Sequence, residues 1–171
     1  MIAPEQWQSL INLEKSDFHS PDQLDWSIVV ALDHFISEVG TRPVIISDYR
    51  SPDPNTPSRH VTGKAIDTSW PGADSIAVYN QARAFTEFAG VGLYVNEVGT
   101  VSIHVDTTEK ANSWGGVITH VLDETTGQQV KKIVYTTVQA VVDLIKKKAP
   151  EAGTVLSLLV VALGLWLLLK K

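Results

Sequence analysis

The feature that most constrains this fold is a set of three candidate metal ligands, His60, Asp67 and His104, which lie far apart in the sequence. Two imidazole nitrogens and one carboxylate oxygen are typical of catalytic zinc, which leaves one coordination position for water. Such a site forms only if the fold brings all three side chains to one point. Each spacing alone arises by chance in many chains, and an isolated histidine is more often an exposed or hydrogen-bonded residue. Together the three residues form a candidate ligand set, which the motifs around them strengthen.

The residues around these candidates indicate how they reach one point. His60 follows a segment, residues 51–59, whose three prolines predict a loop. Asp67 and His104 each lie in a short segment that predicts a strand. Gly63, between the first two candidates, allows the tight backbone turn that their spacing needs. The expected site therefore lies between one loop and two strands.

Further motifs lie on either side of the candidates. In order, the chain reads Ile46-Ser47-Asp48-Tyr49-Arg50-Ser51-Pro52, Ser58-Arg59-His60-Val61-Thr62-Gly63-Lys64-Ala65-Ile66-Asp67, Ile103-His104-Val105-Asp106 and Asn112-Ser113-Trp114-Gly115. This ordered set resembles the M15 family of zinc D-Ala-D-Ala peptidases, which cut peptidoglycan stem peptides. The family string is a strand ending in Ser-Gly-Tyr-Arg, then Ser-x-His-x-x-Gly-x-Ala-x-Asp, a strand carrying His-x-Asp, and a following Trp. The resemblance runs from Phe18 to Trp114.

The resemblance implies that the three candidates bind Zn²⁺. It also implies that Arg50 binds substrate near the metal, where its planar guanidinium suits a terminal carboxylate or a developing oxyanion. A surface ion pair is the alternative for Arg50. Tyr49, Ser58 and Trp114 are further expected at the substrate. Ser58 either orients the loop or contacts the substrate, and Trp114 either lines the cleft or packs beneath it.

The general base is predicted from the position of Asp106. Asp106 lies two residues after His104, so on one strand both side chains point to the same face. There Asp106 is a candidate general base or a partner that orients His104. Many family members carry an acid three residues before the last histidine, where this chain has Val101, and strand parity places Val101 on the opposite face. Glu97, in the preceding loop, is a second candidate base.

Composition excludes some classes of site and partner. The chain has no cysteine, so it has no disulfide and no thiolate ligand for a metal. Residues 1–130 carry 7 Lys/Arg against 17 Asp/Glu, and this balance argues against binding to nucleic acid, which requires neutralised phosphates. Residues 131–171 carry 7 Lys/Arg against 2 Asp/Glu. This asymmetry predicts that the two parts face different surroundings.

The C-terminal region predicts a membrane anchor. Residues 152–169 are 18 residues without a charge, and lysines flank them on both sides. A helix of that length would reach about 27 Å, close to the thickness of the hydrocarbon core of a bilayer. A buried core helix is the alternative. Because basic residues lie on both sides, the orientation in the membrane stays open.

The remaining pattern predicts an α+β fold, and the resemblance to the M15 family implies a small antiparallel sheet flanked by helices. Helices are expected at residues 4–14, 20–39, 75–87 and 137–148, with Ser20 and Gln23 in a capping box and Gly40 as a helix end. Strands are expected at residues 44–46, 65–69, 90–94 and 101–105, with a hairpin over 117–122 and 129–136. The predicted organisation is a peptidase-like domain over 1–136, a basic juxtamembrane helix and linker over 137–151, and a transmembrane helix over 152–169.

These features predict a membrane-anchored zinc peptidase, a hydrolase that cleaves peptidoglycan stem peptides as a D-Ala-D-Ala carboxypeptidase or endopeptidase. By analogy it is a phage lysis enzyme or a virion-associated cell-wall entry enzyme, in a virion internal membrane or in the host cell membrane facing the cell wall. Its expected partners are the peptide substrate and, through residues 152–169, the lipid bilayer. The alternative is a non-catalytic, membrane-anchored structural or peptidoglycan-binding protein, which the missing acid at position 101 favours. A weaker alternative is a membrane-permeabilising protein. The oligomeric state stays open.

Overall fold

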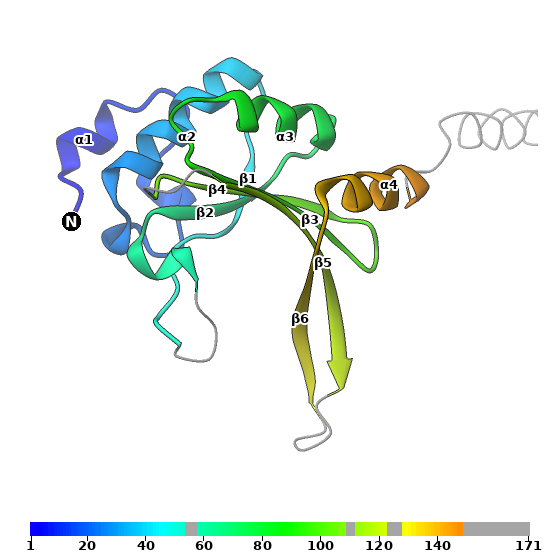
Figure 1. Cartoon of the computed structure of the whole chain (residues 1–171). Coiled ribbons are helices and arrows are strands. Elements are labelled where there is room, and N and C mark those ends of the chain that lie inside the picture. The colour runs from blue at the N-terminus through cyan, green and yellow to red at the C-terminus, as the bar shows by residue number, and fades with distance from the viewer. Residues whose placement is uncertain (54–57, 109–111, 123–127, 149–171) are drawn as a thin grey trace, which may run out of the picture.

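The computed structural model of the chain describes residues 1–53, 58–108, 112–122 and 128–148. Its helices are α1 (Pro4–Gln8), η1 (Lys15–Asp17), η2 (Pro21–Gln23), α2 (Trp26–Val39), η3 (Arg59–Thr62), α3 (Ser75–Ala84) and α4 (Val138–Lys148). Its strands are β1 (Val44–Ser47), β2 (Ala65–Ser69), β3 (Gly90–Asn96), β4 (Val101–Asp106), β5 (Asn112–Leu122) and β6 (Gln129–Thr136). Helices α2 and α3 lie together over the sheet (Figure 1). The α+β class predicted from the sequence agrees with this arrangement.

The six strands form one mixed sheet in the order β1-β2-β4-β3-β5-β6. The predicted antiparallel sheet is wrong in one pairing, because β3 and β5 are parallel. The cause is the path of the chain. β4 folds back antiparallel beside β3, and β5 then pairs with the other edge of β3, so β5 runs in the same direction as β3.

The predicted transmembrane helix also needs correction. Residues 152–169 lie outside the described residues. Within the described part of the chain, no helix has the length and apolar character needed to cross a membrane. The longest element of the helical set, α2, has 14 residues and reaches about 21 Å, against the ~30 Å of a bilayer core. The fold class supported by the structure is therefore a six-stranded α+β domain.

The two faces of the sheet differ in character because side chains alternate along each strand. On β2, β3 and β4 a core-facing residue precedes a residue on the open face, in the pairs Ile66 and Asp67, Leu93 and Tyr94, and Ile103 and His104. The core-facing members pack in one hydrophobic cluster with residues of α2 and α3. Polar residues of the open face are thereby presented side by side on a rigid support.

The N-terminal helices are shorter than the sequence predicts. The buried carboxylate of Asp33 accepts hydrogen bonds from the N–H groups of Ile11, Asn12 and Leu13, which holds these residues out of α1. The single helix predicted from Ser20 is likewise divided.

Residues 21–23 form a separate 3-10 turn, and the cap of α2 lies further along the chain. Leu24 is extended, with φ −80° and ψ 143°, and Asp25 instead caps α2 by accepting from the Ser27 N–H at 2.9 Å. The Ser20 side chain makes no capping hydrogen bond, so the predicted capping box is wrong. The predicted helix end at Gly40 is confirmed by its φ of 71°.

The predicted hairpin is confirmed as β5 and β6, which pair antiparallel from Gly115–Thr136 to Leu122–Gln129. Strand β5 begins earlier than predicted, at Asn112, and its first half extends the sheet beside β3. The far end of the hairpin, where residues 119–122 pair with residues 129–132, projects from the body of the domain (Figure 1). Helix α4 packs against the base of the hairpin. The fully buried Val141 of α4 lies so close to Gly115 that a Cβ at this glycine would be 2.8 Å from the Val141 side chain.

Candidate metal centre

The turn that carries His60 begins at a capping serine and ends at a glycine. His60 lies in η3, where the Ser58 side chain accepts a hydrogen bond from the His60 N–H at 3.3 Å. Gly63 ends this turn with φ 70°. A Cβ at Gly63 would lie 2.1 Å from the main-chain oxygen of Gln23. Both conformation and space therefore require the glycine that the sequence places there.

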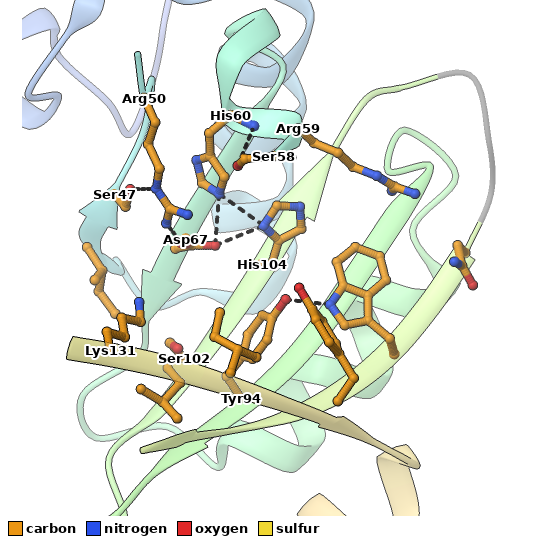
Figure 2. A pocket seen from close by; sticks show the side chains of 16 residues that line it. Ser47, Arg50, Ser58, Arg59, His60, Asp67, Tyr94, Ser102, His104 and Lys131 are labelled. Atoms are coloured by element: carbon orange, nitrogen blue, oxygen red, sulfur yellow. Dashed lines mark hydrogen bonds and ion pairs between the residues drawn. The ribbon is translucent and has the colours of Figure 1, made fainter. Parts of the chain in front are cut away.

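Asp67 and His104 are brought together by strand pairing, because they are direct partners in the register of β2 and β4. His60 Nε2 lies 3.2 Å from Asp67 Oδ1. His104 Nδ1 lies 2.8 Å from the same oxygen, and the two ring nitrogens are 3.2 Å apart. Figure 2 shows the three side chains pointing toward one another. The three predicted ligands thus form a group that could hold a metal ion.

In each imidazole ring, the outer nitrogen, which points away from the three-residue group, already has a hydrogen-bond partner. This partner indicates whether the inner nitrogen, which faces the group, carries a proton in the neutral ring. His60 Nδ1 donates to the main-chain oxygen of Asp48 at 2.5 Å, and a carbonyl oxygen can only accept. His104 Nε2 donates to Asp106 Oδ2 at 3.3 Å. In neutral rings the inner nitrogens therefore carry lone pairs. These two lone pairs and the Asp67 carboxylate face one point, and three acceptors without a donor favour a cation between them.

Asp106 lies behind His104 and is fully buried. Its Oδ2 also accepts from Arg59 Nη1 at 2.5 Å, and its Oδ1 accepts from the N–H and hydroxyl of Thr108 at 3.0 and 2.5 Å. Gly90 leaves room for this cluster, since a Cβ there would lie 2.0 Å from Asp106 Oδ2. Burial raises the pKa of Asp106, but the hydrogen bonds outweigh burial and hold it below its usual range. Asp106 is therefore an anion that orients His104.

Of the two roles that the sequence leaves open for Asp106, its position supports the one that acts on His104. The role of general base stays a prediction. Val101 packs against the hydrophobic core, on the strand face that parity predicts. Glu97 accepts a hydrogen bond from the His120 N–H at 2.9 Å. Among the described residues that line the cavity at the site, Asp67 is the one carboxylate.

Asp48 was not predicted as part of the site, although it supports His60 directly. Its main-chain oxygen accepts from His60, and its buried carboxylate accepts from the N–H groups of His19 and Ser20 at 2.6 and 3.0 Å. The M15 string has glycine at this position. The departure was visible in the sequence as an acid at the end of an apolar strand, but its partners were not, because they are backbone groups.

The ligands tune one another electrostatically. Burial raises the pKa of Asp67, but the adjacent His104 and His60 rings, which favour the charged carboxylate, outweigh burial and hold this pKa well below its usual range. Burial lowers the pKa of His104, while its hydrogen bonds to Asp106 and Asp67 act in the opposite direction and raise the pKa overall. The site therefore attracts positive charge, either a proton or a metal ion.

The candidate metal centre opens into a cavity of about 730 Å³. Its lining residues are Ile46, Ser47, Arg50, Ser58, Arg59, His60, Asp67, Tyr94, Ser102, His104, Asn112, Trp114, Ile118, Lys131, Ile133 and Tyr135. Arg50 is held there by hydrogen bonds to Asp67 Oδ2 and, at 2.9 Å, to Ser47 Oγ. Arg50 and Ser58 are thus at the cavity, as predicted. Tyr49 is not among the lining residues and packs against the core instead.

Trp114 lines the cavity, which is one of the two positions that the sequence leaves open for it. Its ring centroid lies 5.1 Å from that of His104, and the Arg59 guanidinium lies 5.0 Å from the Trp114 ring. Gly92 leaves room for the Trp114 ring in this position, because a Cβ at Gly92 would lie 2.7 Å from the indole. Trp114 Nε1 donates to the Tyr94 hydroxyl at 2.5 Å.

Tyr94 and the β6 residues Lys131, Ile133 and Tyr135 are cavity residues that were not predicted. Burial raises the pKa of Tyr94 and keeps its hydroxyl protonated. The alternation of side chains along β6 indicates which residues share a face, but it does not show that this face turns toward the metal ligands.

Comparisons of the chain with protein-family models, with curated proteins and with solved structures found no match.

Proposed function

We propose that this chain is a zinc-dependent peptidase that hydrolyses peptide bonds in peptidoglycan stem peptides. One observation carries the proposal: the inner nitrogens of His60 and His104 and the carboxylate of Asp67 face one point, and all three residues line one cavity. The ordered motifs around these residues resemble those of the M15 family and support the choice of substrate. The volume of the cavity, about 730 Å³, suits a peptide segment, since ligand sites span roughly 300–1,000 Å³.

The donor set fits zinc. Two neutral imidazoles and one carboxylate are three ligands of the type that catalytic zinc sites use. Each histidine also donates its outer N–H to an acceptor, Asp48 for one ring and Asp106 for the other, which is the support that zinc-binding histidines generally have. When bound, zinc would polarise the scissile carbonyl and lower the pKa of a water molecule in the site.

Arg50 is suited to hold the substrate. Two of its N–H groups bind Asp67 and Ser47, which places the guanidinium beside the metal ligands. The side chain is 38% exposed, and its remaining N–H groups can donate to a substrate carbonyl or carboxylate. As negative charge develops on the carbonyl oxygen, this fixed positive group would stabilise it.

A second candidate function is non-catalytic binding of peptidoglycan. It is favoured by the position of the residues that could have supplied a general base. Asp106 is buried behind His104, and Val101, where many M15 members carry an acid, faces the core. In that case the metal centre would organise a binding cleft without hydrolysis. The two functions share a ligand and differ in product.

The test is digestion of purified peptidoglycan by the zinc-loaded full-length chain, with the products identified by mass spectrometry. We expect loss of a terminal D-Ala or cleavage of a cross-link. This product should disappear with a chelator and in His60→Ala. It should persist in His34→Ala, a matched control, because His34 is exposed and hydrogen-bonded to Glu87 at 3.0 Å. A folded, zinc-loaded protein that sediments with peptidoglycan but forms no product would establish the binding function instead.

A further inference from the structure

We propose that the wall of the cavity formed by β6 is a binding site for a substrate carboxylate and that Lys131 is the residue that binds it. This inference rests on the proposed peptide substrate and specifies how that peptide is recognised. Lys131 lies on β6, on the side of the cavity where Ser47 and Arg50 lie (Figure 2). It belongs to the hairpin, outside the set of metal ligands and their hydrogen-bond partners.

The alternation of residues along β6 defines this wall. Lys131, Ile133 and Tyr135 line the cavity, whereas Lys132 and Val134 do not. The partner of Ile133 across the hairpin is Ile118, which also lines the cavity. Because successive residues of a strand point to opposite faces, Lys131 and Lys132 are neighbours in sequence on opposite sides of the same strand.

The charges at the cavity leave Lys131 available for a ligand. Three cationic side chains line it, Arg50, Arg59 and Lys131. Arg50 is paired with Asp67, and Arg59 is paired with Asp106. No ion pair between described residues includes Lys131. Its ammonium group adds positive charge to a cavity in which the one carboxylate among the described lining residues, Asp67, is already paired with Arg50.

The lining around Lys131 indicates the class of ligand. An ammonium group binds an anion as a point charge, and a carboxylate is the anion that peptides carry. Ile118 and Ile133 lie on the same wall and can pack against the apolar part of a peptide. A stem peptide has a carboxylate at its C-terminus and another on its internal acidic residue, and either could reach this wall.

The test compares Lys131→Met with Lys132→Met in the zinc-loaded full-length chain. The substrates are a synthetic stem pentapeptide and two analogues, one with its C-terminus amidated and one with its internal carboxylate amidated. We expect Lys131→Met to raise KM about 10-fold with little change in kcat, since charge-assisted hydrogen bonds contribute at about this level. Lys132→Met should match the wild type.

The analogues identify the carboxylate that Lys131 binds. Amidation of that group should raise the KM of the wild type by the same factor and should have no further effect on Lys131→Met. Amidation of the other carboxylate should affect both proteins equally. Equal KM values for Lys131→Met, Lys132→Met and the wild type would overturn the inference and leave the peptidase function standing.

Calorimetric titration of the same peptides separates the two proposals if the wild type does not cleave. A peptide that binds the wild type without cleavage contradicts the peptidase function, and its Kd then tests Lys131 by the same comparison of variants. A peptide that neither binds nor is cleaved overturns both proposals.

Discussion

The strands that carry the candidate metal ligands and the hairpin that completes the cavity contribute to the same site, yet they are built differently. The last four residues of β4 are buried, and every residue of β2 is buried or half-buried. Strand β6 is exposed at seven of its eight positions. The ligand strands are packed on one face against the core, whereas the far end of the hairpin projects from the domain (Figure 1).

This difference matches the task that we propose for each region. A metal ion needs its ligands within a few tenths of an ångström of ideal distances, and buried neighbours with satisfied hydrogen bonds can hold them there. Recognition of a substrate carboxylate by a long lysine side chain tolerates more freedom. We therefore expect substitutions in the ligand strands to change metal binding and stability, and similar substitutions in the hairpin to change neither.

The largest expected effect is a difference in zinc affinity between the alanine variants of two histidines. His104→Ala removes a ligand from β4, and we expect the zinc affinity to fall by more than about 100-fold, beyond the loss typical of an outer-shell partner. His120→Ala, in the hairpin strand β5, should bind zinc as the wild type does. Calorimetric zinc titration of both variants checks this comparison. Equal affinities would contradict the assignment of His104 as a ligand.

The next effect is on zinc affinity and concerns Asp106, the carboxylate that accepts a hydrogen bond from His104. Asp106→Asn keeps the shape of the side chain but removes the charge that accepts from His104, Arg59 and Thr108. We expect zinc affinity to fall about 10- to 100-fold. Zinc titration checks it, with circular dichroism to verify that the fold is kept. An unchanged affinity would mean that His104 is oriented by packing alone.

A smaller expected effect is a difference in the free energy of unfolding between the threonine variants of two valines. Val105→Thr places a hydroxyl group in the core beneath β4, where the side chain is 1% exposed, and should lower the free energy of unfolding by about 1–3 kcal/mol. Val134→Thr, on β6 at 48% exposure, should change it by less than about 0.5 kcal/mol. Urea denaturation of both variants measures the difference. Similar values would show that the hairpin is as tightly packed as the ligand strands.

The smallest expected effect is a pH dependence that zinc reverses. Because folding raises the pKa of His104 above its ordinary value of 6.5, the protonated ring stabilises the metal-free fold below that value. This contribution is lost as the pH rises through the raised pKa. Zinc requires the unprotonated ring, so its stabilising effect should grow over the same range.

Urea denaturation between about pH 5 and about pH 9, with chelator or with zinc, measures both trends. Val134→Thr should follow the wild type in each series, since the titrating ligand lies in β4. A metal-free protein whose stability rises across this range would contradict the assigned environment of His104.

Several features were predictable because they depend on local chemistry. The turn at Gly63, the helix end at Gly40 and the hairpin follow from residue type and spacing, whereas the three candidate ligands were identified from the ordered motifs around them. Strand parity also placed Val101 away from the site and Asp106 on the same face as His104. These predictions held because a two-residue period and a positive φ are properties of a short segment.

What the sequence by itself determined is therefore the set of candidate metal-binding side chains and the strand faces from which Asp67 and His104 project. Tertiary structure alone decided that β5 pairs with β3 in parallel, that Asp48 supports His60 through its main-chain oxygen, and that Lys131 faces the cavity. The physical reason is that strand order and backbone hydrogen bonds join distant segments. A main-chain acceptor is the same in every residue type, and a face of a strand acquires its neighbours only when the sheet is assembled.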